Sequence, residues 1–88
     1  NIVILGDVNP GAELFAKGNI VVMGALKGFA HAGLDGEDDA FVTANRLQPT
    51  QLRIGTVISR PPDDGFEGVE YPEIAYLKDG HIVIEPNV

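Results

Sequence analysis

The sequence predicts an all-β fold, a right-handed parallel β-helix or solenoid with roughly 18 residues and three short strands in each turn. Two observations support this prediction. The chain repeats itself near its start, and its apolar runs are short, rich in β-branched residues and separated by residues that favour turns. A third observation limits the architecture, because 88 residues are enough for only one domain with one modest core.

The repeat relates residues 1–18, NIVILGDVNPGAELFAKG, to residues 19–36, NIVVMGALKGFAHAGLDG. Asn, Ile, Val, two Gly and Ala recur at equivalent positions, and the pattern then fades until residues 79–84 restate part of it. In stacked turns, each strand pairs with its equivalent one turn later, about 4.8 Å away, and inward side chains fill a central core. The repeat therefore predicts parallel pairing between equivalent strands.

The predicted strands are short segments bounded by Gly, Asn, Pro or Asp. Helical periodicity competes weakly, because Gly or Pro interrupts most longer windows. Two segments break the period. Residues 34–39 read as a lengthened corner, and residues 60–72, rich in Pro, Gly and acidic residues, read as a loop or a bridge to the final half-turn. The expected strands are residues 1–5, 11–16, 19–23, 29–33, 40–44, 51–54, 56–59, 73–77 and 81–85.

Composition and charge exclude several classes of function. The formal charge is −7, from 13 acidic and 6 scattered basic residues, whereas a nucleic-acid-binding protein concentrates its Lys and Arg on one face. The absence of Cys excludes disulfides and thiolate chemistry. No apolar run approaches the roughly 18 to 20 residues that a membrane helix needs. Because the chain opens on Asn1 and an apolar run, we expect a piece of a longer protein.

Strand alternation predicts which side chains face outward. In residues 51–54, inward Leu52 and Ile54 leave Gln51 and Arg53 outside. Residues 1–5 and 19–23 are instead apolar on both faces, and a soluble monomer rarely leaves such a patch in water. We expect a two-fold homodimer, unless residues 60–72 or a preceding segment cover the patch. The predicted interface contains Val3, Leu5, Val21, Met23 and Val83.

Candidate catalytic and metal-binding groups are few. Glu13 and His31 fall at equivalent repeat positions, so a stacked pair could approach a metal, but an outward polar ladder explains them more simply. The only serine, Ser59, lacks a hydrolase motif. The acidic residues within 35–39 lack the spacing and closing Glu of a calcium-binding loop. We therefore predict no catalytic residues, no metal and no cofactor.

Three stretches together resemble the C-terminal domain of MinC septum inhibitors: GDVNPGAELFAKGNIVVMGALKGFAHAG at 6–33, LQPTQLRI at 47–54 and DGHIVIEP at 79–86. The match covers nearly the whole chain in the same order. The resemblance implies a non-enzymatic domain of cell-division control that forms a homodimer, binds the membrane-associated ATPase MinD and helps recognise the division protein FtsZ. It also implies a cytoplasmic protein recruited to the inner membrane surface through MinD.

Two parts of the family lie outside these 88 residues. Its N-terminal domain antagonises FtsZ assembly, and a short Arg-Ser-Gly-Gln motif important for MinD binding lies just ahead of the segment that matches Asn1. Residues 7–13 form a tight Asn-Pro-Gly corner near that motif, so the MinD-binding side is expected there. Lys27 resembles a basic position of the family, whereas Phe29 stands where some relatives have Arg. The expected MinD-binding residues are Asp7, Asn9, Glu13, Lys17 and Lys27.

Two other solenoid families compete with this interpretation. A bactofilin-like solenoid would polymerise end to end, but residues 60–72 do not fit that pattern. A left-handed acyltransferase of the hexapeptide type needs a strict six-residue repeat, which fails here beyond the first two turns. Handedness and association state distinguish the three.

Overall fold

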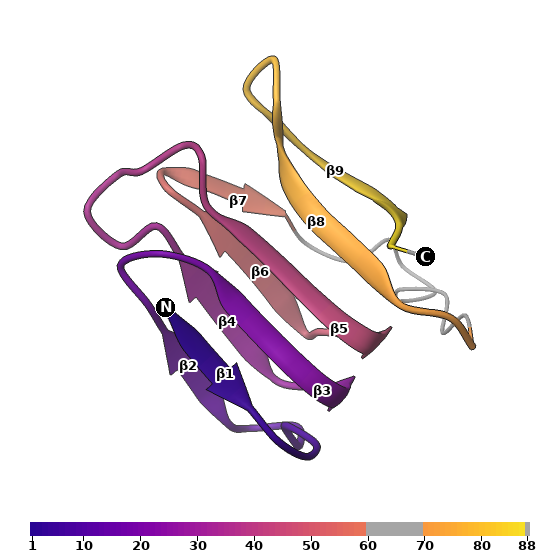
Figure 1. Ribbon diagram of the computed structural model, residues 1–88. Helices are drawn as coiled ribbons and strands as arrows, with labels where there is room; N and C mark the ends of the chain where they lie inside the picture. Colours follow the sequence, from indigo (N-terminus) through magenta and orange to yellow (C-terminus); the bar gives the residue numbers. More distant parts are fainter. Residues whose placement is uncertain (60–69, 88) are drawn as a thin grey trace.

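The computed structural model describes residues 1–59 and 70–87, and the regular elements in those ranges are nine strands (Figure 1). Each of the nine predicted segments overlaps one of them, and β3, β5, β8 and β9 extend beyond the predicted ends. The predicted loop at residues 60–72 lies largely outside the described residues. The strands are β1 (Ile2–Ile4), β2 (Glu13–Phe15), β3 (Ile20–Leu26), β4 (Phe29–Ala32), β5 (Phe41–Leu47), β6 (Gln51–Ile54), β7 (Val57–Ser59), β8 (Glu73–Lys78) and β9 (His81–Pro86).

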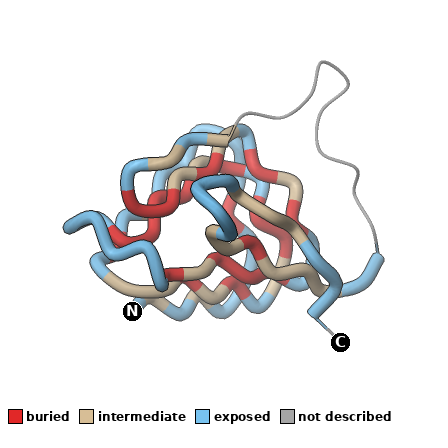
Figure 2. Tube along the Cα trace, turned by 90° about the horizontal axis from the view of Figure 1, so that it is seen from above, coloured by how far each residue is buried: buried red, intermediate tan, exposed pale blue. Residues whose placement is uncertain are grey.

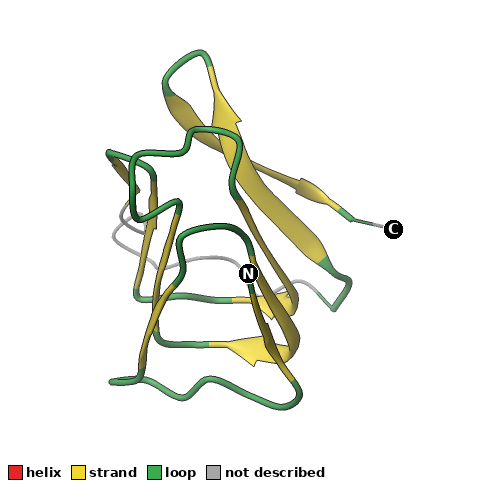
Figure 3. Ribbon diagram, turned by 60° about the vertical axis from the view of Figure 1, so that its left-hand side comes forward, coloured by secondary structure: helices red, strands yellow, loops and turns green. Residues whose placement is uncertain are grey.

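The strands form two mixed sheets that face one another (Figure 3). One sheet has the order β1-β3-β5-β8-β9 and the other the order β2-β4-β6-β7. From β1 to β6 the chain alternates between the sheets, so neighbouring strands of each sheet run parallel in this part. The later pairs, β6 with β7, β5 with β8 and β8 with β9, are antiparallel. The result is a small, sandwich-like all-β domain.

The predicted right-handed parallel β-helix with three strands per turn is therefore wrong, although the all-β class is right. The strand predicted at residues 19–23 does not end before Gly24, because β3 continues through this glycine with a register shift between Val22 and Ala25. A Cβ atom on Gly24 would lie 2.3 Å from the carbonyl oxygen of Gly6, so this close approach of two backbones requires glycine. The antiparallel return of β7, β8 and β9 then replaces further turns, and no closed solenoid forms among the described residues.

The predicted repeat register holds in the first sheet, where Ile2 pairs with Ile20. It fails in the second sheet, because the Asn-Pro-Gly-Ala turn of residues 9–12 is replaced by the shorter Lys27-Gly28 in the next repeat. Glu13 consequently pairs with Phe29 and not with His31, so the suggested stacked pair of Glu13 and His31 is wrong. The lengthened corner predicted at 34–39 is confirmed as the turn region between β4 and β5.

The core lies between the sheets (Figure 2). Inward positions of both sheets supply it, and full burial of each such aliphatic side chain contributes about 1.5–3 kcal/mol. Because successive residues of a strand alternate in direction, the burial of these residues sets the direction of their neighbours on the outer faces. The largest fully buried side chains are Ile20, Val22, Leu26, Val42, Leu47, Leu52 and Ile54.

An asparagine ladder joins successive parallel strands of the five-stranded sheet. The side-chain oxygen of Asn1 accepts a hydrogen bond from the backbone N–H of Asn19 at 2.8 Å, and the side-chain oxygen of Asn19 accepts one from Phe41 at 2.9 Å. The side-chain oxygen of each Asn thus satisfies a backbone N–H donor near the start of the next parallel strand of the sheet. The recurrence of Asn at the start of both repeats is explained by this bonding.

Candidate functional site

The outer face of the five-stranded sheet carries a broad apolar surface, here called the apolar face: Val3, Val21, Met23, Phe41, Ile74, Tyr76 and Val83. Alternation places these side chains outward, because their strand neighbours Ile20, Val42 and Ala75 are buried. Val3 is 61 % exposed and Met23 is 54 % exposed. The face extends across all five strands, which makes it wider than the ladder that the sequence predicts.

The structure brings most of the predicted interface residues together. Val3 pairs with Val21, Met23 follows on β3, and Leu5 lies 84 % exposed just beyond β1. Val83 does not extend this ladder as predicted, because β5 and β8 separate β9 from β3. The sequence reasoning missed Phe41, Ile74 and Tyr76, whose alternation with buried residues was the available signal.

Polar groups within the apolar face find partners in the chain. The Thr43 hydroxyl donates to the carbonyl oxygen of Glu73 at 2.7 Å and accepts from the side-chain amide of Asn87 at 3.1 Å. A side-chain hydrogen bond with Glu85 raises the pKa of Tyr76 above its usual value of 10.0. On the opposite, inward side of β8, burial raises the pKa of Glu73 above 4.5. The hydroxyl groups of Thr43 and Tyr76 on the apolar face thus have partners within the chain.

The outer face of the four-stranded sheet carries a compact cluster of rings, here called the aromatic face: Phe15, Phe29 and His31. The ring centroids of Phe15 and Phe29 lie 5.5 Å apart, and that of His31 lies 6.2 Å from Phe15. The parallel register sets Phe15 beside His31 and His31 beside Arg53, and the β6–β7 hairpin adds Ile58. Phe15 and Ile58 are each 47 % exposed.

His31 and Arg53 are held at the centre of this row. His31 is 7 % exposed, and its Nε2 lies 3.1 Å from the carbonyl oxygen of Gly55. Gly55 has a φ of 58°, which suits the turn that returns the chain as β7. The Nε atom of Arg53 is buried and has no hydrogen-bond partner within residues 1–59 and 70–87. The predicted outward direction of Arg53 agrees with the burial of Leu52 and Ile54.

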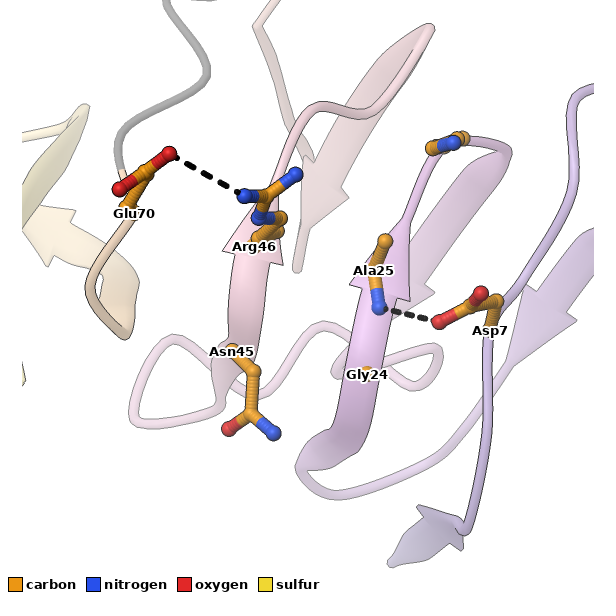
Figure 4. A pocket seen from close by; sticks show the side chains of 7 residues that line it. Asp7, Gly24, Ala25, Asn45, Arg46 and Glu70 are labelled. Atoms are coloured by element: carbon orange, nitrogen blue, oxygen red, sulfur yellow. Dashed lines mark hydrogen bonds and ion pairs between the residues drawn. The ribbon is translucent and has the colours of Figure 1, made fainter.

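A polar pocket of about 340 Å³ lies beside the ends of β3 and β5 (Figure 4). It brings together two of the predicted partner-binding residues, Asp7 and Lys27, with Arg46 and Glu70. The Asp7 carboxylate accepts a hydrogen bond from the backbone N–H of Ala25 at 2.8 Å, and Arg46 lies 3.6 Å from Glu70. Asp7 thus has a structural role, because its hydrogen bond joins the segment after β1 to β3. The partner-binding role predicted for Asp7 stays a prediction.

The other predicted partner-binding residues lie elsewhere. Glu13 is exposed on β2, in the strand that also carries Phe15. Lys17 forms an exposed ion pair with Asp35 at 3.8 Å. The carbonyl oxygen of Asn9 accepts from the backbone N–H of Ala12 at 3.0 Å and closes the tight turn. The five residues are therefore spread over a corner, a strand and a pocket, and their role in binding stays a prediction.

Within the described ranges, no group of three His, Asp or Glu side chains could hold a metal ion. Ser59 ends β7, on the strand beside Leu52. None of the described segments forms a helix of the length and hydropathy that a membrane crossing needs.

Two outward apolar faces lie on opposite sheets, and exposed apolar surface of this kind is typical of protein-interaction modules. Residues 1–87 match the family described as the C-terminal domain of the septum formation inhibitor MinC. The chain belongs to this family, which confirms the resemblance found in the sequence.

Relatives and a solved structure agree with this assignment. The chain is 62 % identical over 85 residues to the probable septum site-determining protein MinC of Heliobacterium modesticaldum, covering 97 % of this chain and 29 % of that protein. The corresponding protein of Acetivibrio thermocellus is 56 % identical, with 97 % and 38 % covered. The chain thus spans well under half of these relatives. A chain of the MinC:MinD cell division protein complex of Aquifex aeolicus superposes with a TM-score of 0.90 at 43 % identity, covering 96 % of this chain and 69 % of that one.

Proposed function

We propose that this chain is the self-associating, MinD-binding part of a protein that takes part in placing the division septum. The observation that carries the proposal is the pair of outward apolar faces, one on each sheet. A domain with two such faces can pair with a copy of itself and still present a second surface to another protein. The similarity to a chain from a MinC:MinD complex supports MinD as that other protein.

Self-association uses the apolar face. A two-fold dimer places the same patch of each copy in contact, so a broad, continuous surface suits it better than a narrow one. The exposed Val3, Leu5 and Met23 lie at one edge of this face, and Val83 lies at the other. Burial of these side chains between two copies removes apolar surface that a soluble monomer rarely leaves exposed.

MinD binding uses the aromatic face together with the adjoining corner. Aromatic residues in a compact cluster are typical anchors of protein interfaces. Glu13 lies beside this cluster on β2. The further contacts that we propose for MinD are spread over the neighbouring turns and the polar pocket, and they are Asp7, Asn9, Lys17 and Lys27. Through MinD, a cytoplasmic protein of this kind reaches the inner membrane surface. In the longer protein, the domain contributes to recognition of FtsZ, whose assembly a separate N-terminal domain inhibits.

Two variants test the two faces separately. Met23→Lys places a charge within the proposed dimer interface and should weaken self-association by about tenfold or more, because the ammonium group must be desolvated without a partner. The measurement is molar mass by light scattering over a concentration series. Leu34→Lys is the matched control, since Leu34 is 41 % exposed in the β4–β5 turn region. A Met23→Lys dimer as stable as the Leu34→Lys dimer refutes the assigned interface.

The MinD surface is tested with Phe15→Ala, which removes an exposed ring from the aromatic face. We expect about tenfold weaker MinD binding with an unchanged dimer, since buried aromatic anchors carry much of the affinity of an interface. Binding of the full-length protein to immobilised MinD measures this. If Phe15→Ala binds as well as Leu34→Lys, MinD does not dock on the aromatic face.

A further inference from the structure

Arg53 is an unusual residue to find in the aromatic face. The chain carries a formal charge of −7, yet this permanently charged cation is placed between the nearly buried His31 and the apolar Ile58. Neither ion pair formed among the described residues includes Arg53. Within residues 1–59 and 70–87, Arg53 is therefore a positive charge without an ion-pair partner in the middle of an apolar patch.

The hydrogen-bonding state of Arg53 is the second observation. Its Nε is shielded from solvent and has no acceptor in the described part of the chain. A buried donor without a partner costs about 1–3 kcal/mol, and more when the group is charged. The Nε2 atom of His31 cannot accept this hydrogen bond, because it lies 3.1 Å from the Gly55 carbonyl oxygen and must donate to it. Because Nε itself is shielded, an acceptor from outside would reach the terminal Nη groups of Arg53, which form no hydrogen bond or ion pair within residues 1–59 and 70–87.

The neighbouring strands supply no carboxylate to this position. Register places His31 on one side of Arg53 and Ile58 on the other. Among the described strands of this sheet, the acidic residue nearest to Arg53 is Glu13, on β2, two strands from β6. Glu13 belongs to the adjacent cross-strand row, which continues through Phe29 to Gln51. At a cross-strand spacing of about 4.8 Å, Glu13 lies roughly 10 Å from Gln51 along that row.

From these observations we propose that Arg53 receives a carboxylate side chain of the protein that docks on the aromatic face. This inference rests on the proposed MinD-binding function and adds the chemistry of the contact. A guanidinium group offers two parallel N–H donors, which match the two oxygens of a carboxylate. Phe15 and Ile58 border the contact, and their docked partner surface excludes water around it. Because both proteins must align this single ion pair, Arg53 determines the orientation of the bound partner.

The experiment compares binding of purified MinD to the full-length protein with Arg53→Gln, Arg53→Lys and the control Lys78→Gln. Lys78→Gln makes the same change in charge at an exposed residue of the β8–β9 hairpin, in the other sheet and outside the proposed MinD-binding side. We expect Arg53→Gln to weaken binding by about tenfold to a hundredfold, and Arg53→Lys by about tenfold, since lysine keeps the charge but lacks the paired donors. A titration of salt should show a smaller loss of affinity with salt for Arg53→Gln than for Lys78→Gln.

The outcomes separate this inference from the function on which it rests. If Phe15→Ala weakens MinD binding while Arg53→Gln binds like Lys78→Gln, the carboxylate contact is refuted and the docking face stands. If neither Phe15→Ala nor Arg53→Gln affects binding, both are refuted. A third arm supports the contact directly, because Arg53→Glu should regain affinity with one MinD variant in which a surface Asp or Glu is changed to Lys. Failure of every such variant to restore binding counts against the ion pair.

Discussion

The outer faces of the two sheets differ in extent and in the state of their polar groups. The apolar face crosses five strands, and its Thr43 and Tyr76 form hydrogen bonds within the chain. The aromatic face is a compact cluster in which Arg53 keeps a buried donor without an acceptor in the described residues. A surface with satisfied polar groups suits a copy of itself, whereas an unsatisfied cation requires a different, complementary partner.

The largest expected effect comes from the core that both faces share. Leu52→Ala removes a fully buried side chain from β6 and should lower the free energy of unfolding by about 2–5 kcal/mol, because the cavity between the sheets cannot collapse completely. Urea denaturation measures the change. Ile58→Ala, in the same hairpin, is the control and should cost less, since Ile58 is 47 % exposed.

The Leu52→Ala variant also tests whether the apolar face and the aromatic face depend on each other. If Leu52→Ala weakens dimerisation and MinD binding together, the two faces depend on one cooperative unit. If the Leu52→Ala variant has the same urea midpoint of unfolding as the wild-type protein, the assignment of Leu52 to the core is incorrect.

The individual strands could be predicted from the sequence, because alternation and turn residues act locally. Each predicted segment overlaps a strand, and Val3, Leu5 and Met23 are exposed as expected. The relation between strands could not be predicted in the same way. It depends on the length of the connection, as the Asn-Pro-Gly-Ala turn of residues 9–12 shows when compared with Lys27-Gly28.

The aromatic face was missed for this reason. With the repeat aligned at equal length, Glu13 falls opposite His31, and the rings of Phe15 and Phe29 are not brought beside it. The true register sets Phe15 against His31. Similarly, residues 79–84 look like a further parallel turn, but β9 pairs with β8 in the opposite direction. A local pattern of this kind does not carry the direction of the pairing partner.

A smaller effect is expected in the asparagine ladder, which joins strands of one sheet only. Asn19→Ala removes the acceptor for the backbone N–H of Phe41 and should cost about 1 kcal/mol. Hydrogen exchange of the Phe41 amide should become faster. The amides of β4 and β6, in the other sheet, should change their exchange rates only as much as the loss of overall stability requires. Asn45→Ala, at an exposed position of β5, is the control. Equal acceleration in both sheets would contradict a local role.

The smallest expected effect is a change in the titration of the apolar face. Glu85 raises the pKa of Tyr76 by a side-chain hydrogen bond first, with desolvation and charge repulsion adding to it. Since the folded protein then holds this proton more tightly than the unfolded chain, stability must fall as the pH rises above 10.0 through the higher folded pKa. Glu85→Gln should lower the Tyr76 pKa toward its usual value and weaken this dependence.

Ultraviolet absorbance of the tyrosinate, in a Tyr71→Phe background that leaves Tyr76 as the only tyrosine, measures the pKa. The same titration bears on the comparison of the faces. When two copies cover the apolar face, the ionised tyrosine loses further hydration, so the Tyr76 pKa should rise with protein concentration. In Met23→Lys it should not. A Tyr76 pKa that is independent of concentration in both proteins would place this residue outside the contact, and the dimer would then use only the Val3, Val21 and Met23 edge of the sheet.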